Sequence, residues 1–123
     1  MRAFEYASPS ALQQAVELLG ANSAAVLAGR TDLLALMKDE VVTPGRLVNI
    51  KQIAELRGIR FNAKTGLRMG ALTTIAECAD NADVSRHYPV LAQATSEAAS
   101  PQIRNLATLG GNLCQRPRCW YFR

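Results

Sequence analysis

The segment AAVLAGRTDLLALMK, residues 24–38, decides the expected fold. It opens with a short apolar run of the buried-strand type, Ala24–Ala28, and continues through Gly29 into a second apolar run with helical character. A strand, a glycine turn and a helix in that order form half of an α/β unit. The sequence TPG at residues 43–45 then breaks the chain, and Arg46–Ile50 is predicted to be the next strand.

The residues before this segment complete a small α/β lobe. Phe4–Tyr6 alternates like a short strand, and Ser8 followed by Pro9 predicts a helix start with Ser8 as its N-cap. Apolar residues recur at helical spacing over Leu12–Leu19, and Gly20 is a natural stop. The expected order is strand, helix, strand, helix, strand within about fifty residues.

The pattern changes near residue 57. Two short alternating runs, Gly58–Phe61 and Leu67–Gly70, flank a polar turn and predict a hairpin. The helices expected after it run from the cap Thr74 to Ala79, over Pro89–Ala99 and as a turn over Ile103–Leu106, with a strand-like start at Ala107. The chain is therefore expected to form an α/β lobe over residues 1–57 and the start of an α+β lobe over residues 58–123.

Composition limits the class of protein. The chain has 123 residues, is 49% hydrophobic and carries a net charge of +4, so general disorder and an obligatory nucleic-acid partner are not indicated. No apolar run approaches the roughly 20 residues that a membrane helix needs. The N-terminus lacks the apolar centre of a secretory signal. We expect a cytoplasmic location, with the periplasm as the alternative if a partner subunit carries an export signal.

The first candidate site is the glycine turn and its flanks. A glycine turn that leads into a helix exposes backbone N–H groups, which suits a phosphate or pyrophosphate, and Arg30 adds charge. The alternative is an ordinary strand-to-helix turn capped by Thr31 or Asp32. The candidate residues are Leu27, Ala28, Gly29, Arg30, Thr31, Asp32, Leu33 and Leu34.

The second candidate site is the diglycine segment TLGGN, residues 108–112. Two glycines allow the backbone to approach a flat or anionic ligand closely. The alternative is a β-turn or bulge. The candidate residues are Thr108, Gly110, Gly111 and Asn112.

The three cysteines do not complete a metal site within the chain. Cys114 and Cys119 have the spacing C-x4-C, and Cys78 is expected to be a buried structural thiol. A half-site whose other ligands lie beyond residue 123 is one interpretation. Another takes residues 115–123 as a basic-aromatic strip for single-stranded nucleic acid.

Together, four segments resemble the FAD-binding (medium) subunits of the xanthine dehydrogenase/molybdenum hydroxylase family. The last of them resembles especially the aldehyde oxidoreductase and hydroxybenzoyl-CoA reductase-like branch, whose flavin subunit carries an additional [4Fe-4S] cluster. The segments are LAGRTDLL (27–34), MGALTTIAE (69–77), SPQIRNLATLGGNL (100–113) and QRPRCWYFR (115–123).

The resemblance implies the two-lobed FAD-binding fold of that family, with the second lobe incomplete. It implies that residues 27–34 supply backbone N–H groups to the FAD pyrophosphate and that Thr108, Gly110, Gly111 and Asn112 form a second wall. Cys119 then matches the first ligand of the extra [4Fe-4S] cluster, with Cys114 as a secondary candidate. Arg30 stands where the family usually has a second glycine. Its side chain either restricts the turn or places a guanidinium on a phosphate.

The implied function is electron transfer without a catalytic residue in this chain. Electrons would leave a molybdenum cofactor on a large subunit, cross [2Fe-2S] clusters on a small subunit and reach FAD, with no nucleic-acid or membrane partner. Family members run to about twice this length or more. The chain is therefore expected to be an N-terminal fragment that binds FAD weakly or not at all and is inactive alone. The rival interpretations are a truncated non-catalytic remnant or interaction module, and a small metal- or nucleic-acid-binding protein.

Overall fold

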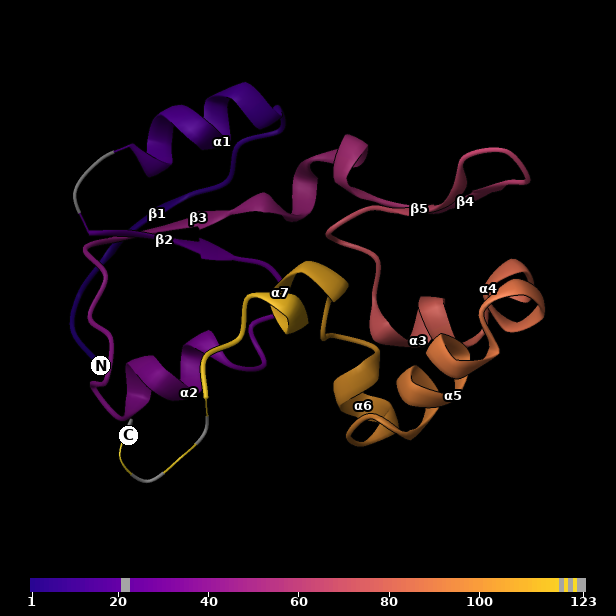
Figure 1. Cartoon of the computed structure of the whole chain (residues 1–123). Helices are drawn as coiled ribbons and strands as arrows, with labels where there is room; N and C mark the ends of the chain where they lie inside the picture. Colours follow the sequence, from indigo (N-terminus) through magenta and orange to yellow (C-terminus); the bar gives the residue numbers. More distant parts are fainter. Residues whose placement is uncertain (21–22, 118, 120, 122–123) are drawn as a thin grey trace. The chain divides into compact units, whose positions relative to one another are not determined.

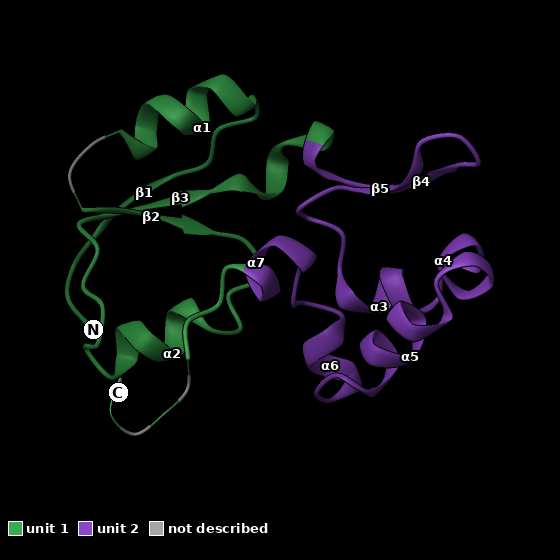
Figure 2. Ribbon diagram, viewed as in Figure 1, with its two compact units in different colours: residues 1–55, 114–123 green, residues 56–113 purple. Residues whose placement is uncertain are grey.

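The computed structural model describes residues 1–20, 23–117, 119 and 121 (Figure 1). It divides the chain into unit 1, Met1–Glu55 with Cys114–Arg123, and unit 2, Leu56–Leu113 (Figure 2). The sequence predicted a boundary near residue 57 and a tail in the second lobe, whereas the structure groups the tail with unit 1. Each unit has its own buried residues and is described by itself.

Unit 1 alternates strands and helices. Its strands form a parallel sheet in the order β1-β3-β2, with α1 on one side of the sheet and α2 on the other (Figure 1). The elements are β1 (Glu5–Ala7), α1 (Leu12–Leu19), β2 (Ala24–Leu27), α2 (Leu33–Lys38), β3 (Arg46–Asn49) and the 3-10 turns η1 (Ile50–Gln52) and η2 (Ala54–Leu56).

The central strand β3 is buried on both faces. Leu47 and Val48 are successive residues and therefore point to opposite sides of the sheet, yet they are only 2% and 0% exposed. Leu47 joins Leu27 and Met37 in the core on the α2 side, where Leu33 and other partly buried side chains pack against them. Burial on both faces is typical of a strand in a parallel sheet with helices on either side.

Helix α1 begins later than the sequence predicted. The predicted N-cap, Ser8, does not cap the helix, because the N-cap position is Ala11. The Asn49 side chain donates to the hydroxyls of Tyr6 (2.6 Å) and Ser8 (3.4 Å) at the end of β1. The helix starts at Leu12, whose N–H donates to Glu55 Oε1 at 3.2 Å. A carboxylate from 43 residues downstream thus replaces the local cap.

Unit 2 begins with a hairpin and continues as short helices. The hairpin is antiparallel, and Asn62 Oδ1 accepts the N–H groups of Lys64 and Thr65 in its turn. The elements are β4 (Ile59–Asn62), β5 (Gly66–Met69), α3 (Ile75–Ala79), α4 (Ala82–His87), α5 (Pro89–Glu97), α6 (Pro101–Arg104) and α7 (Leu109–Leu113). In the described part of the chain, no helix has the length and apolarity of a membrane span.

Two local predictions for unit 2 are corrected. Helix α4 was not predicted, and its N-cap is Asn81, whose side chain accepts the N–H of Val84 at 3.0 Å. The strand expected at Ala107 is reduced to a single bridge between Thr74 and Thr108, and helix α7 follows at once. Pairing stops there because the chain on both sides of the bridge turns into a helix.

The threonine cap predicted for helix α3 is present, and the structure shows it to be part of a capping box. Thr74 Oγ1 accepts the N–H of Glu77 at 3.1 Å, and Glu77 Oε2 accepts the N–H of Thr74 at 2.7 Å. Ile75 and Cys78 on the same helix are buried. The capping box therefore holds the N-terminus of a helix that contributes to the core of unit 2.

We expect Thr74→Ala to lower the free energy of unfolding of unit 2 by about 1 kcal/mol, because two N–H groups lose their acceptors or their geometry. Urea unfolding followed at amide resonances of unit 2 measures this. The control is Thr65→Ala, which removes an exposed hydroxyl in the hairpin turn and should change stability by less than about 0.5 kcal/mol. Equal effects of the two substitutions would contradict the capping role.

Candidate functional site

The loop between β2 and α2 lies at the carboxyl end of an edge strand. The side chains on either side of it are fixed, because Leu27 belongs to the unit 1 core and Leu33 and Leu34 pack against that core. Gly29 is buried, whereas Arg30 is exposed. Of the eight residues that the sequence singled out, three thus anchor the loop, and Ala28 to Asp32 form it.

Backbone N–H groups in this loop are available to a ligand. Among the residues that the structure describes, the N–H groups of Arg30, Thr31 and Leu33 have no hydrogen-bond acceptor. Asp32 occupies the N-cap position of α2, but its side chain makes no capping hydrogen bond. The loop therefore differs from a turn closed by its own side-chain cap, and its free donors fit an anion.

Arg30 has a backbone conformation that normally favours glycine. Its φ is +69°, in the left-handed region, where a Cβ crowds the neighbouring carbonyl group. The sequence left open whether this side chain restricts the turn or reaches a phosphate. The positive φ shows that the turn keeps a left-handed conformation in spite of the side chain.

The diglycine segment is helical, so the alternative of a β-turn or bulge is wrong. Thr108 Oγ1 accepts the N–H of Gly111 at 3.2 Å, and Thr108 O accepts that of Asn112 at 2.9 Å. The N–H groups of Leu109 and Gly110 donate to Thr73 O (2.8 Å) and Ala71 O (2.9 Å). Every backbone donor from Leu109 to Asn112 is therefore used within unit 2.

Gly110 is required by packing within unit 2. A Cβ at this position would lie 2.9 Å from Ala71 Cβ and 3.0 Å from Ala71 O, closer than side chains normally approach. Gly111 is exposed, and a Cβ there would meet Thr108 Oγ1 at 3.0 Å. The two glycines thus serve different purposes, and of the four candidate residues in this segment Gly111 and Asn112 are the exposed ones. The contact with Ala71 was not foreseen, although Ala71 lies in the MGALTTIAE segment.

The cysteines separate into one buried thiol and two exposed ones. Cys78 is 0% exposed, as predicted, and burial raises its pKa, while a hydrogen bond with the Thr95 side chain acts in the opposite direction. A thiol that stays protonated is a poor metal ligand or nucleophile. Cys114 and Cys119 are exposed in the tail. No group of three or more possible metal ligands exists among the described residues.

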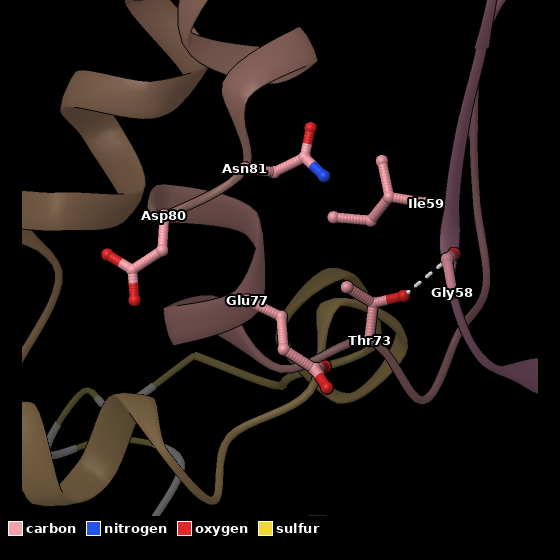
Figure 3. Close-up of a pocket in the computed structure, with 6 residues that line it drawn as sticks. All are labelled: Gly58, Ile59, Thr73, Glu77, Asp80 and Asn81. Carbon is pink, nitrogen blue, oxygen red and sulfur yellow. Dashed lines mark hydrogen bonds between the residues drawn. The ribbon is translucent and has the colours of Figure 1, made fainter.

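A pocket of about 320 Å³ in unit 2 contains none of the predicted site residues (Figure 3). In it the Thr73 hydroxyl donates to Gly58 O at 3.1 Å. Figure 3 shows Ile59 and Asn81 pointing toward each other and Asp80 pointing away. The carboxylate of Glu77 in its wall already caps α3. Two carboxylates around a pocket repel an anionic ligand, so this pocket does not suit a pyrophosphate.

The two predicted pyrophosphate segments belong to different units. Residues 27–34 lie in unit 1, and residues 108–112 lie in unit 2 (Figure 2). The described residue Cys119 belongs to the tail that groups with unit 1. Each segment is therefore a separate structural element, with free backbone donors in the first and an exposed asparagine in the second.

Comparison with known families and proteins gives consistent matches. Residues 2–118 match the family model described as the FAD binding domain in molybdopterin dehydrogenase. The chain is 40% identical over 115 residues to the xanthine dehydrogenase FAD-binding subunit of Escherichia coli O157:H7, covering 90% of this chain. It is 40% identical over 123 residues to the aldehyde oxidoreductase FAD-binding subunit of Escherichia coli K12, covering 99% of this chain.

A solved structure agrees with the fold. The carbon monoxide dehydrogenase of Hydrogenophaga pseudoflava that lacks the Mo-pyranopterin moiety matches 91% of this chain with a TM-score of 0.87 and 38% identity. The predicted mixed α/β fold is thereby confirmed. The chain spans 39% of that structure's chain, and 39% and 38% of the two Escherichia coli subunits.

We expect Arg30→Gly to raise the free energy of unfolding of unit 1 by about 0.5–1 kcal/mol, because glycine adopts a positive φ without steric cost. The matched control is Arg30→Ala, which removes the same charge and keeps the Cβ. Urea unfolding followed at amide resonances of unit 1 compares the two. If both variants have the stability of the parent chain, Arg30 carries no backbone strain.

We expect Gly110→Ala to destabilise unit 2 by about 1–3 kcal/mol, because the added methyl group overlaps Ala71. The control is Gly45→Ala, where the nearest atom to the added Cβ would lie at 3.8 Å, an ordinary contact distance. Urea unfolding followed at amide resonances measures both variants, in unit 2 for Gly110→Ala and in unit 1 for Gly45→Ala. A Gly110→Ala protein as stable as its parent would show that α7 does not pack closely on Ala71.

Proposed function

The chain belongs to the family of FAD binding domains in molybdopterin dehydrogenases, and from this premise we propose that it binds the pyrophosphate of FAD as part of a flavin electron-transfer subunit. The observation that carries the proposal is the β2–α2 loop. The backbone N–H groups of Arg30, Thr31 and Leu33 have no acceptor among the described residues, while the flanks of the loop are fixed in the core.

The first wall of the proposed site is residues 27–34. The N–H groups of Arg30, Thr31 and Leu33 would donate to phosphate oxygens, which accept hydrogen bonds strongly because they are charged. The guanidinium of exposed Arg30 would add a charge that the backbone alone cannot supply. Leu27, Leu33 and Leu34 would hold the loop in place from the core side, and Ala28, Gly29 and Asp32 would complete the backbone of the loop.

The second wall is Thr108, Gly110, Gly111 and Asn112, with distinct roles for its members. Thr108 and Gly110 would position α7, since one caps the helix and the other packs on Ala71. Gly111 would keep the surface free of a side chain, and the exposed amide of Asn112 would supply the polar contact. Because the backbone N–H groups here are already used, this wall would act through a side chain.

FAD, when bound, supplies a centre that accepts and releases electrons. In the proposed assembly, a large subunit carries a molybdenum cofactor and a small subunit carries [2Fe-2S] clusters, and electrons reach FAD from them. They then pass to an acceptor such as NAD, a quinone, ferredoxin or oxygen. This chain would contribute binding and orientation, and the substrate would be chosen by the molybdenum subunit.

The finer proposal is membership of the aldehyde oxidoreductase-like branch with an extra [4Fe-4S] cluster. The alignment with the aldehyde oxidoreductase subunit spans 99% of this chain, whereas that with the xanthine dehydrogenase subunit spans 90%. Such a cluster is held by cysteine thiolates. Exposed Cys119 would be one ligand, with Cys114 as a secondary candidate and the remaining ligands supplied from outside the described residues.

We expect FAD at about millimolar concentration to shift the amide resonances of Arg30, Thr31 and Leu33, because a small open site gives weak binding. Riboflavin, which lacks both phosphates, should leave them unchanged. Nuclear magnetic resonance of the isotopically labelled 123-residue chain detects both outcomes. Unshifted loop amides, or equal shifts with riboflavin, would contradict pyrophosphate binding by this loop.

The same titration tests the contribution of the second wall to FAD binding. Asn112→Ala should weaken FAD binding about three- to tenfold, since one exposed hydrogen bond to a charged group is lost. The matched control is Asn105→Ala, an exposed asparagine next to α6 that should leave the affinity unchanged.

A further inference from the structure

The outer face of the β4–β5 hairpin is basic. Ile59, Phe61 and their cross-strand partners are partly buried, whereas Arg60 and Arg68 are exposed on the other face. Residues 58–70 contain three basic residues, Arg60, Lys64 and Arg68, and no aspartate or glutamate. We call these three residues the hairpin basic cluster.

Arg60 and Arg68 are direct cross-strand partners. Side chains in such a pair start from Cβ atoms about 5 Å apart on the same face of the sheet. Two like charges at this position oppose strand pairing, and a hairpin of only two strands has little stability to spare. Of the ionic contacts between described residues, none involves Arg60, Lys64 or Arg68.

No ion pair among the described residues offsets this repulsion. Elsewhere in the structure a basic strand residue has an acidic cross-strand partner. Arg46 lies opposite Glu5 in the sheet of unit 1 and donates to it at 2.6 and 2.8 Å. Arg60 and Arg68 have no such acidic partner among the described residues, so both guanidinium groups can bind an acidic group of another molecule.

We propose that the hairpin basic cluster is a docking surface for an acidic segment of a partner polypeptide. The two guanidinium groups present donors in a planar fork, which matches carboxylate geometry. Neither the pocket of Figure 3 nor the apolar pocket beside α5 is lined by Arg60 or Arg68, and an open surface encloses a small anion poorly. An extended surface with a row of donors fits a chain of carboxylates better than a single ion.

Nucleic acid is the weaker occupant. Binding to a phosphate backbone normally uses more basic contacts than these three residues provide, and single strands also need exposed aromatic platforms. The aromatic ring on this hairpin, Phe61, points to the other face and stacks on His87 with ring centres 4.0 Å apart. The cluster is independent of the proposed flavin site, so either proposal can fail without the other.

The test is the fluorescence anisotropy of a labelled oligoglutamate peptide titrated with the 123-residue chain at about 20 mM salt, where exposed charges are weakly screened. We expect saturable binding that falls steeply at about 200 mM salt. The pair Arg60→Gln and Arg68→Gln should weaken it about tenfold. The matched control, Arg2→Gln with Lys38→Gln, removes the same charge from unit 1 and should change binding less than twofold.

A second variant separates docking from a structural role. Arg60→Glu places opposite charges across the strands, so it should raise the urea midpoint of unit 2 while abolishing peptide binding. Unfolding of the hairpin cannot explain a loss of binding that accompanies a gain in stability. Undiminished binding in Arg60→Glu, equal loss in the unit 1 control, or no binding by the parent chain would each overturn the proposal. So would tighter, equally Arg60-dependent binding of inorganic phosphate or a single-stranded oligonucleotide.

Discussion

Burial of strand β3 on both faces is the constraint on which unit 1 depends. Leu47 and Val48 point to opposite sides of the sheet, and neither is accessible to solvent. Both sides must therefore be covered, which the chain achieves with α1 on one and α2 on the other. Parallel strands can be joined only by such crossovers, so a loop is needed where β2 ends and α2 begins. The β2–α2 loop is thus a consequence of covering β3, and its free N–H groups arise where the backbone leaves one element before entering the next.

Unit 2 depends on a different constraint, the close contact of irregular chain segments. Residues 70–73 run beside the start of the unit, where Leu72 N donates to Leu56 O and Gly70 N donates to Gly58 O. The same segment accepts the N–H groups of α7 through Ala71 and Thr73. Short helices and a two-stranded hairpin leave many backbone groups without partners of their own, so these cross-connections satisfy them. Position 110 requires a glycine because this segment lies against it.

The sequence predicted most elements whose pattern is local. Helix α2, Leu33–Lys38, forms in the apolar run that was expected to be helical, and the cap at Thr74 was visible as a threonine before an apolar run. Helix α4 was missed because its six residues include only two apolar ones, and its N-cap Asn81 resembles a loop residue. The start of α1 was misplaced because Glu55, far along the chain, supplies its cap. A helix at the diglycine was not predicted, because nothing local reveals that Ala71 lies against it. Local signals predicted local structure, and contacts distant in sequence decided the rest.

Gly110 and three arginines of this chain show how a residue that packing explains differs from one that packing does not explain. Gly110 is explained by packing, because a side chain at this position would overlap Ala71. No ligand is needed to explain a glycine there. Arg30 and the pair Arg60–Arg68 oppose the local structure, one through a positive φ and the other through cross-strand repulsion. A residue that stabilises nothing near it and costs free energy where it stands is better explained by a contact outside the unit. In this chain such residues are arginines on exposed surfaces, and the contacts that we propose for them are with anions: phosphate at the β2–α2 loop and carboxylate at the hairpin.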